Sequence, residues 1–384
     1  MKVVVNICLA LLIFIKVVNS TGTETFQNRS NNQTIKNEIK ENLSGITAIH
    51  TDNSVNVWIG SNNSLFTLDA DNLNKIFYRP GRISDKNYDT ELAKGFIRDI
   101  YEDRTGIIWI ASREGAIDQY DPNQDKFSDY YITLKPSGRR DYIKDIKRDA
   151  TGMYWIATFG DGLLYVDKSG NIKKRYLSPM ISSDTLNALL LDETGYLWIG
   201  GLQGIDVMNI HSENIQKRFR GGTDDLKYLK HPAIYKIIQD YKGFIWVLTQ
   251  EGLNCINPQN NKFMYRKLCK NIQLKKIYDI FEDNHQNIIL TGFNGVAFID
   301  SSTLNISYLR NYKEGEKALS NSFVKSGIHE KNGIYWFGTE NGLNIYNKNE
   351  GKIRVLTERD GLSSANIYFN IVKTDHEIWI NSAC

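Results

Sequence analysis

Two stretches decide the fold. Residues 237–252 read Ile-Ile-Gln-Asp-Tyr-Lys-Gly-Phe-Ile-Trp-Val-Leu-Thr-Gln-Glu-Gly, and residues 100–115 read Ile-Tyr-Glu-Asp-Arg-Thr-Gly-Ile-Ile-Trp-Ile-Ala-Ser-Arg-Glu-Gly. Both place Asp six residues before a tryptophan, Gly three before it and Gly six after it. Asp-x-x-Gly favours a tight turn, because Asp caps nearby amides and Gly accepts positive φ. The β-branched and aromatic run that follows predicts a short buried strand.

The same pattern recurs at intervals of 43 to 51 residues along nearly the whole chain of 384 residues. Its anchors are Trp58, Trp109, Trp155, Trp198, Trp246, Ile289, Trp336 and Trp379. Each unit contains four short strand patterns, which is typical of one blade of a β-propeller. We therefore expect an all-β protein with a seven-bladed propeller of four-stranded antiparallel blades at residues 44–362.

The anchors have one role in every repeat. We expect the tryptophans to pack blade against blade rather than to stack on a sugar, because all stand at the same strand position. The repeated aspartates lack calcium-binding spacing, so we expect turn caps rather than metal ligands. Gln286 and Ile289, which replace the turn glycine and the tryptophan, mark the sixth unit as degenerate.

The ends of the chain differ from the repeats. Residues 1–20 carry Lys2 and an apolar run to Ile15, which predicts a signal peptide; the alternative is an uncleaved membrane anchor. Residues 21–43 are a polar segment from which one strand could latch onto the last blade. Residues 363–384 form a partial eighth repeat, either the start of a second propeller or a strand pair that closes the ring.

Charge and cysteine content exclude several classes. Lys and Arg number 47 against 44 acidic residues, a net charge of +3, which gives no reason to expect nucleic acid as a partner. Four cysteines do not make a disulfide framework. In the expected register Cys255 lies opposite Met264 or Tyr265, away from Cys269, so we expect two free, packed thiols.

The repeat resembles the two-component regulator propeller repeat, most clearly at residues 146–158 and 335–343, and Asp360–Asn366 is similar to that family's link into a next blade. The resemblance covers residues 44–382. It implies the periplasmic sensor of a hybrid two-component system of Bacteroides-type bacteria, which binds oligosaccharides from complex glycans. It also implies partners: a second propeller, an immunoglobulin-like domain, a membrane helix, a histidine kinase and a response regulator with a DNA-binding module. We expect no membrane helix, kinase or DNA-binding part within this sequence. The chain is then an amino-terminal sensor portion, which would act as a homodimer in a full-length receptor.

No linear catalytic, phosphate-binding or metal-binding motif occurs, so we expect no catalytic residue, metal or cofactor. We expect ligand contacts instead on the loops after each tryptophan strand and on the loops that link the blades, because propeller loops of one face converge. Aromatic, amide and guanidinium groups there suit sugars, and Arg suits a uronate or sulfate. The candidate ligand-binding residues are Arg113, Arg139, Tyr142, Phe159, Asp161, Gln203, Tyr235, Gln250, Phe293 and Glu340.

The sequence therefore predicts an exported, ligand-sensing propeller of a two-component receptor with an oligosaccharide ligand. Three alternatives stay open: a secreted propeller enzyme (a lyase or glycosidase) acting on polysaccharide, a protein-interaction scaffold, and a truncated remnant without function.

Overall fold

The computed structural model describes residues 2–8, 11–16, 46–52, 56–61, 65–68, 75–78, 97–102, 106–112, 117–124, 126–128, 143–168, 170–222, 228–311, 318–360, 366–373 and 378–382. Within these residues seven four-stranded antiparallel sheets follow one another along the chain, which confirms the propeller fold. Blade one is β3 (Ile46–Thr51), β4 (Val57–Ser61), β5 (Leu65–Leu68) and β6 (Lys75–Tyr78). Blade two is β7 (Ile97–Glu102), β8 (Ile108–Ser112), β9 (Ile117–Asp121) and β10 (Lys126–Ser128).

The other five blades repeat this order. Blade three is β11 (Ile143–Arg148), β12 (Tyr154–Thr158), β13 (Leu163–Val166) and β14 (Ile172–Tyr176), and blade four is β15 (Leu186–Leu191), β16 (Tyr196–Gly201), β17 (Gly204–Asn209) and β18 (Asn214–Phe219). Blade five is β19 (Ile234–Gln239), β20 (Ile245–Thr249), β21 (Gly252–Asn257) and β22 (Lys262–Met264), followed by the short helix α2 (Arg266–Lys270). Blade six is β23 (Lys276–Glu282), β24 (Ile288–Phe293), β25 (Gly295–Ile299) and β26 (Ile306–Leu309). Blade seven is β27 (Val324–His329), β28 (Ile334–Thr339), β29 (Gly342–Asn347) and β30 (Lys352–Leu356), with 3-10 turns at Lys331–Gly333 and Glu358–Asp360.

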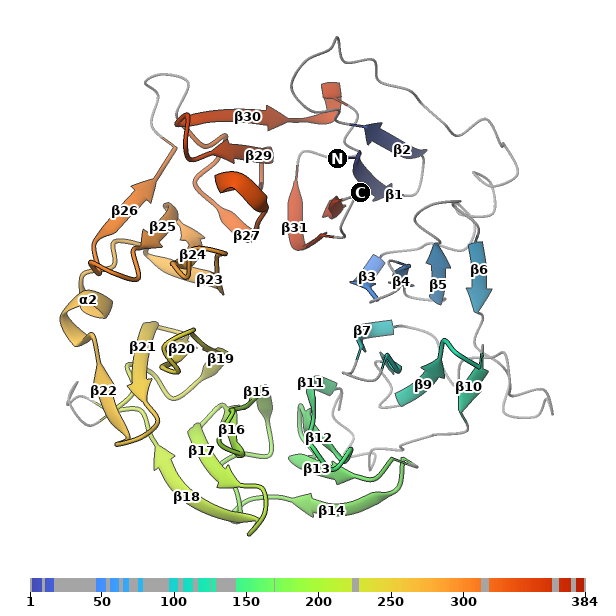
Figure 1. Ribbon diagram of the computed structural model, residues 1–384, viewed down its shortest axis with the longest axis vertical. Coiled ribbons are helices and arrows are strands. Elements are labelled where there is room, and N and C mark those ends of the chain that lie inside the picture. The colour runs from blue at the N-terminus through green and yellow to red at the C-terminus, as the bar shows by residue number, and fades with distance from the viewer. Residues whose placement is uncertain are drawn as a thin grey trace.

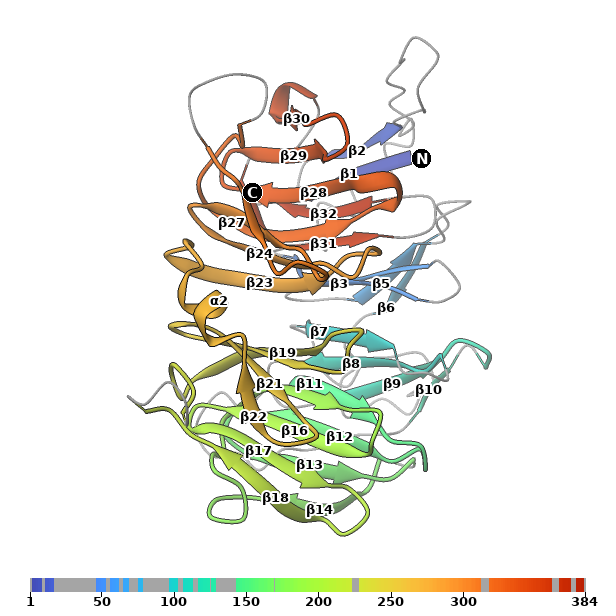
Figure 2. The ribbon, with the colours of Figure 1, turned by 60° about the vertical axis from the view of Figure 1, so that its left-hand side comes forward.

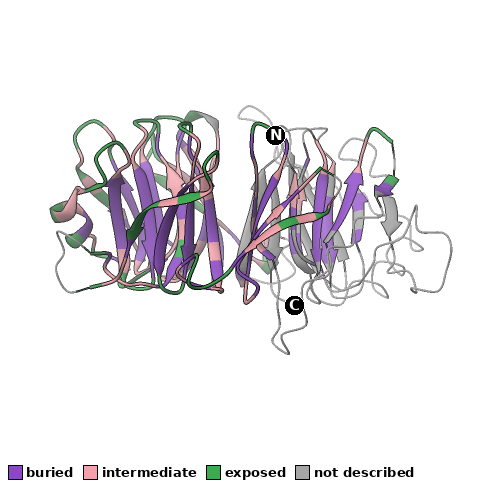
Figure 3. Cartoon of the chain, turned by 90° about the horizontal axis from the view of Figure 1, so that it is seen from below, coloured by how far each residue is buried: buried purple, intermediate pink, exposed green. Residues whose placement is uncertain are grey.

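The sheets stand around one axis with the first strand of each blade innermost (Figures 1 and 2). Buried residues concentrate in the strands, whereas exposed residues gather in the loops at the two ends of the axis (Figure 3). We call the end that holds the blade links and the loops between second and third strands the linking face. The opposite end, with the Asp-x-x-Gly turns, is the turn face.

Five of the tryptophans pack one blade against the next. Trp198 of blade four shares a buried cluster with Ile234 and Ile237, the first and fourth residues of β19 in blade five. Trp58, Trp109, Trp155 and Trp246 meet the next inner strand in the same way. Removing so large a buried side chain costs about 3–5 kcal/mol, so these contacts are a major part of the fold's stability. Trp379 lies on β32 (Ile378–Ser382), and its side chain is outside the described residues.

In blades one, three, four and five the repeated aspartate caps the turn and also holds the tryptophan of its blade. In blade four, Oδ1 of Asp192 accepts the backbone N–H groups of Thr194 and Tyr196, at 2.9 and 3.0 Å. Its Oδ2 accepts the indole N–H of Trp198 at 2.9 Å. The same indole bond joins Asp52 to Trp58, Asp149 to Trp155 and Asp240 to Trp246. One buried carboxylate therefore fixes both the turn and the packing residue.

Blades six and seven depart from this rule. In blade six, where Ile289 replaces the tryptophan, Oδ2 of Asp283 accepts the hydroxyl of Tyr335 from blade seven at 2.6 Å. In blade seven Glu330 takes the aspartate position, and its Oε2 accepts the indole N–H of Trp336 at 2.9 Å. Gln286 takes φ 66° at the turn-glycine position, in agreement with the degenerate sixth unit.

The last strands fill an eighth place in the ring. β31 (Ile367–Lys373) pairs with β32 and lies between β27 of blade seven and β3 of blade one. Gly338 of blade seven shows that β31 packs as a regular next blade, because a Cβ there would lie 2.6 Å from Cγ2 of Ile367. At Gly200 of blade four the corresponding distance, to Ile234 of blade five, is 2.7 Å. Within the described residues, seven complete blades and the β31–β32 pair thus surround the axis.

The amino-terminal residues also lie at this eighth place. β1 (Lys2–Cys8) pairs with β2 (Leu11–Lys16), and β1 runs beside β32 (Figures 1 and 2). The signal-peptide assignment of residues 1–20 stays a prediction, and the expected latch segment, residues 21–43, lies outside the described residues.

The cysteine expectation is confirmed for the two described thiols. Cys255 pairs with Met264 across β21 and β22, and Cys269 lies on α2; both are buried and free. Burial raises the pKa of Cys269 to about 11 and that of Cys255 further, so both remain protonated thiols at neutral pH.

Candidate functional site

Every complete blade has a bulge at the linking-face end of its inner strand. In blade three, for example, Ile143 pairs with Thr158 and Asp145 with Ala157, which leaves Lys144 as the extra residue. The same shift follows the first residue of six inner strands and the second residue, Ile277, of β23. A bulge re-aims the side chain of the extra residue, and bulges are frequent beside functional sites.

The bulge residues are not the same in every blade, although the scaffold repeats: they are lysine in blades three and seven, asparagine in blade four and tyrosine in blades five and six. We call five of them, whose side chains the structure describes, the axial residues; they are Lys144, Asn187, Tyr235, Tyr278 and Lys325. Thr47 and Arg98 occupy the same register in blades one and two, with side chains outside the described residues. The axial residues thus place amine, amide and phenol groups at one end of the axis.

Three residues that the sequence predicts for the site lie directly beside the axial residues. Lys144 stands over the ring of Phe159 with its Nζ 5.7 Å from the ring centre. Nζ of Lys325 pairs with Oε1 of Glu340 at 3.0 Å. Burial raises the pKa of Tyr278, and the nearby carboxylate of Glu340 raises it further. Glu340 of blade seven therefore lies close to Tyr278 of blade six at the linking face. Phe293 ends the second strand of the blade that carries Tyr278.

The remaining predicted residues have mixed placements. Tyr235 lies on β19 as its bulge residue and not in a blade link, and it is 42% exposed. Gln203 and Gln250 are exposed in the loops after the second strands of blades four and five. Arg113, Arg139 and Tyr142 are outside the described residues. Six of the predicted residues therefore lie on this face with accessible side chains: Phe159, Gln203, Tyr235, Gln250, Phe293 and Glu340.

Asp161 is different, because its carboxylate is already used within the fold. It is 7% exposed and forms an ion pair with Arg175 of the outer strand β14. A buried carboxylate with its own cation is held by that pair, and breaking it would be costly. We therefore assign Asp161 to the support of the loop and leave it out of the proposed site.

Buried polar residues on the third strands hold the blade links in place. Asn254 and Asn344 each accept a backbone N–H of a link with Oδ1, from Lys230 at 3.3 Å and from Ser320 at 2.8 Å. Asp206, 2% exposed, accepts the N–H and hydroxyl of Ser182 and lies 3.4 Å from the guanidinium of Arg220. The donor stands 24 residues before the acceptor in all three cases. This recurring interval is a sequence signal that our expectations missed.

The axial residues other than Tyr235 were also missed, although they too have a sequence signal. Each stands eleven residues before its anchor, from Lys144 before Trp155 to Lys325 before Trp336. This position varies between lysine, asparagine and tyrosine, whereas the packing and turn positions recur.

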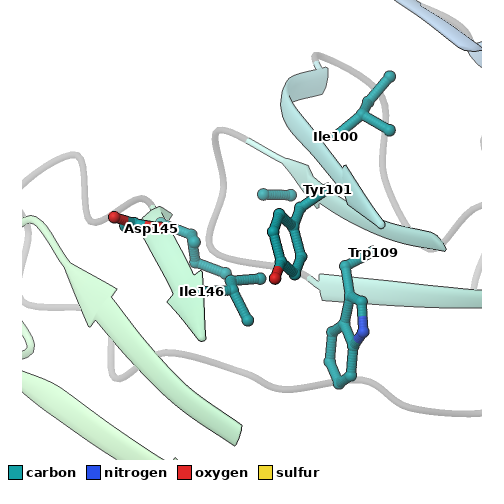
Figure 4. Close-up of a pocket in the computed structure, with 7 residues that line it drawn as sticks. Ile100, Tyr101, Trp109, Asp145 and Ile146 are labelled. Atoms are coloured by element: carbon teal, nitrogen blue, oxygen red, sulfur yellow. The ribbon is translucent and has the colours of Figure 1, made fainter. Parts of the chain in front are cut away.

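One cavity lies between blades two and three, with a volume of about 60 Å³. Apolar side chains line most of it, and Tyr101 stands between Ile146 and Trp109 (Figure 4). Ligand pockets are usually about 300–1,000 Å³, so this cavity suits a few waters rather than a saccharide.

The histidines that the structure describes do not gather with the axial residues. His50, His211, His285 and His329 lie toward the turn face, and His231 lies in the link between blades four and five. The described residues contain no group of three or more His, Cys, Asp or Glu side chains that could hold a metal ion. Among the described helices, none is long and apolar enough to cross a membrane.

Residues 91–114 match the family model of the two component regulator propeller, which confirms the resemblance of the repeat. No curated protein sequence matches the chain. The fold is similar to the extracellular domain assigned to the hybrid two component system BT3049 of B. thetaiotaomicron (TM-score 0.54, 17% identity), with 88% of this chain and 50% of that chain covered. It is also similar to that of BT4673 from the same organism (TM-score 0.56, 20% identity), with 87% and 43% covered. The chain thus spans half or less of the length of these two structures.

The propeller fold also occurs in an enzyme. Virginiamycin B lyase from Staphylococcus aureus is similar in fold with a TM-score of 0.54 and 14% identity. The match covers 77% of this chain and 92% of the lyase. At these identities the likeness establishes the fold, and function has to be argued from the site.

Proposed function

We propose that this chain is the extracytoplasmic, ligand-sensing propeller of a two-component receptor and that it binds an oligosaccharide on the linking face. The axial residues and the loops after the second strands form the binding site. Export to the periplasm, homodimer formation and signalling through downstream receptor domains belong to the same proposal.

One observation carries it: the bulges place lysine, asparagine or tyrosine at the axis, depending on the blade, on a scaffold that otherwise repeats. The recurring Asp, Trp and Gly positions serve packing and turns. The axial residues include Tyr235, which is exposed, and an aromatic ring suits the face of a sugar. The amide N–H of Asn187 already donates to the backbone carbonyl of Ile234 at 2.8 Å. The matched repeat at residues 91–114 and the fold shared with two extracellular receptor domains support a sensor.

A ligand that contacts several blades could act by differential affinity. If the propeller takes two arrangements against its neighbouring domain, a saccharide that binds one arrangement more tightly shifts the population toward it. The coupling free energy would then bias the receptor dimer.

The first test uses two tyrosines at opposite ends of one inner strand. Tyr235 begins β19 at the linking face, and Tyr241, 46% exposed, follows its end at the turn face. The protein is screened by thermal shift against neutral and acidic oligosaccharides. A ligand at 100 times its dissociation constant should stabilise the fold by about 2.7 kcal/mol.

For the sugar that stabilises the wild type, we expect Tyr235→Ala to weaken binding tenfold or more and Tyr241→Ala to leave it unchanged. Equal effects of both substitutions, or no stabilising sugar in the panel, would contradict the proposed site.

A propeller enzyme is the second candidate, because virginiamycin B lyase shares the fold. Chromatography of each mixture after incubation separates the two functions. A sensor leaves the oligosaccharide intact, whereas a lyase or glycosidase converts it to shorter products.

A further inference from the structure

Blade six presents a pair of aromatic rings on the linking face. Phe293, at the end of β24, and Phe323, in the link to blade seven, have ring centres 4.4 Å apart and form an isolated backbone bridge. Both rings are half-buried, so part of each surface is open to solvent. Such a pair offers an apolar surface on which a sugar ring can stack.

Two exposed lysines stand over this sector. Nζ of Lys275 lies 5.3 Å from the ring centre of Phe293, and Nζ of Lys276 lies 5.5 Å from that of Tyr278. Neither lysine has an ion pair with a carboxylate in the described part of the chain. A cation over a ring keeps N–H donors that can still bind an anion.

The nearby described carboxylates have their own cations. Glu340 pairs with Lys325 at 3.0 Å, and Asp279 pairs with Lys236 at 2.6 Å. Lys275 and Lys276 therefore leave two positive charges uncompensated among these six residues. Tyr278 adds a hydroxyl that remains protonated at neutral pH, since burial and then Glu340 raise its pKa.

We propose that this sector, defined by Lys275, Lys276, Tyr278, Phe293 and Phe323, selects an acidic saccharide by binding its carboxylate or sulfate. The two lysines bind the anion while the sugar ring stacks on the phenylalanines. This inference rests on the proposed function and specifies which class of oligosaccharide the same face takes.

The test compares three probes: oligogalacturonate, which carries carboxylates, keratan sulfate oligosaccharides, which carry sulfates, and neutral galactan oligosaccharides. Titration calorimetry is run on the full chain and on the double variant Lys275→Gln/Lys276→Gln. Lys217→Gln is the matched control, because Lys217 is also an exposed lysine over a phenylalanine, 5.9 Å from the ring centre of Phe219, but lies on the outer strand β18.

We expect one acidic probe to bind, the double variant to weaken it tenfold or more, and Lys217→Gln to leave it unchanged. The arginine pair Lys275→Arg/Lys276→Arg should retain binding, and affinity should fall as salt rises. The probe that binds distinguishes carboxylate from sulfate. Binding of galactan alone, or acidic binding that the glutamines do not change, would overturn this inference and leave the proposed function standing. Absence of binding by all probes would count against both.

Discussion

At the scale of the residue, blades one, three, four and five each depend on one buried aspartate that caps a turn and holds an indole. Blade six keeps the carboxylate of Asp283 without its tryptophan, and Tyr335 supplies the missing donor from blade seven. Burial by itself would raise the pKa of Asp283. The bonds from Tyr335, Asn287 and His285 outweigh burial and hold that pKa below its ordinary 3.8. Tyr335 thus replaces the blade's own anchor across a blade boundary.

Tyr335→Phe tests this replacement. A hydrogen bond to an ionised acceptor contributes about 1.5–3 kcal/mol, so we expect a loss of that size at pH 7. The lowered pKa of Asp283 stabilises the fold above about pH 3.8, and that contribution disappears as pH falls through the lower folded value. Urea unfolding should therefore show that the difference in free energy of unfolding between wild type and variant is smaller at pH 3 than at pH 7.

Tyr346→Phe is the control, because it removes a phenol hydroxyl from a ring that packs on Tyr335, with centres 6.3 Å apart. It should cost less at pH 7 and show no such pH dependence. If the loss of unfolding free energy in Tyr335→Phe stays constant or grows in acid, Tyr335 does not stabilise the ionised Asp283 as described.

How far the sequence predicts such contacts depends on the distance along the chain. Asp192 and Trp198 stand six residues apart inside a repeat, so their spacing predicts both turn and anchor. Tyr335 and Asp283 are 52 residues apart, and only the twist and packing of two blades bring them together. Spacing within a repeat predicts local geometry, but it does not predict that a residue of one blade supplies a hydrogen bond that the neighbouring blade lacks.

At the scale of the element, blades fit together where a second strand lies against the next inner strand. Gly200 of β16 has no room for a side chain, since an added Cβ would lie 2.7 Å from Cγ2 of Ile234. Ala157 of β12, two residues after its own anchor like Gly200, carries a methyl group there and is fully buried. The size of this residue is therefore set by the neighbouring blade.

Gly200→Ala should destabilise the protein by about 1–3 kcal/mol, because the extra methyl pushes on a packed isoleucine. Chemical unfolding measures the change. Ala157→Ser, a change of similar size at the equivalent position of blade three, reports how far any added atom is tolerated there. A neutral Gly200→Ala would mean that the interface between blades four and five is looser than the structure shows.

The bulges belong to this scale as well. Alternation of side chains along a strand would place Ile234 and Ile237, three residues apart, on opposite faces, yet both are buried. It does not predict that an extra residue shifts the register between Ile234 and Lys236, because a bulge is a backbone feature with no fixed composition. Tyr235 was therefore expected in a link and lies in a strand.

At the scale of the whole molecule, the ring has eight places and seven complete blades. β31 closes the gap between blades seven and one, with Ile367 fully buried against Gly338. The repeat count predicts seven blades and a remainder. It could not decide between a second propeller and closure of the ring, because both begin with the same strand pattern.

Truncating one buried isoleucine to alanine costs about 2–5 kcal/mol. Removal of residues 363–384 should lower the free energy of unfolding by more than that. Calorimetry should show a lower and broader melting transition, and Ile367→Ala should give a smaller shift in the same direction. An unchanged transition after truncation would show that seven blades close the ring by themselves.

The bulges have a consequence for how such a protein diversifies. Their register is fixed by backbone pairing, and the described extra residues are half-buried or exposed rather than part of the buried core. Under the proposed function, a single codon eleven positions before an anchor could then change recognition while the recurring packing positions stay the same. Recognition would change one blade at a time on the same ring.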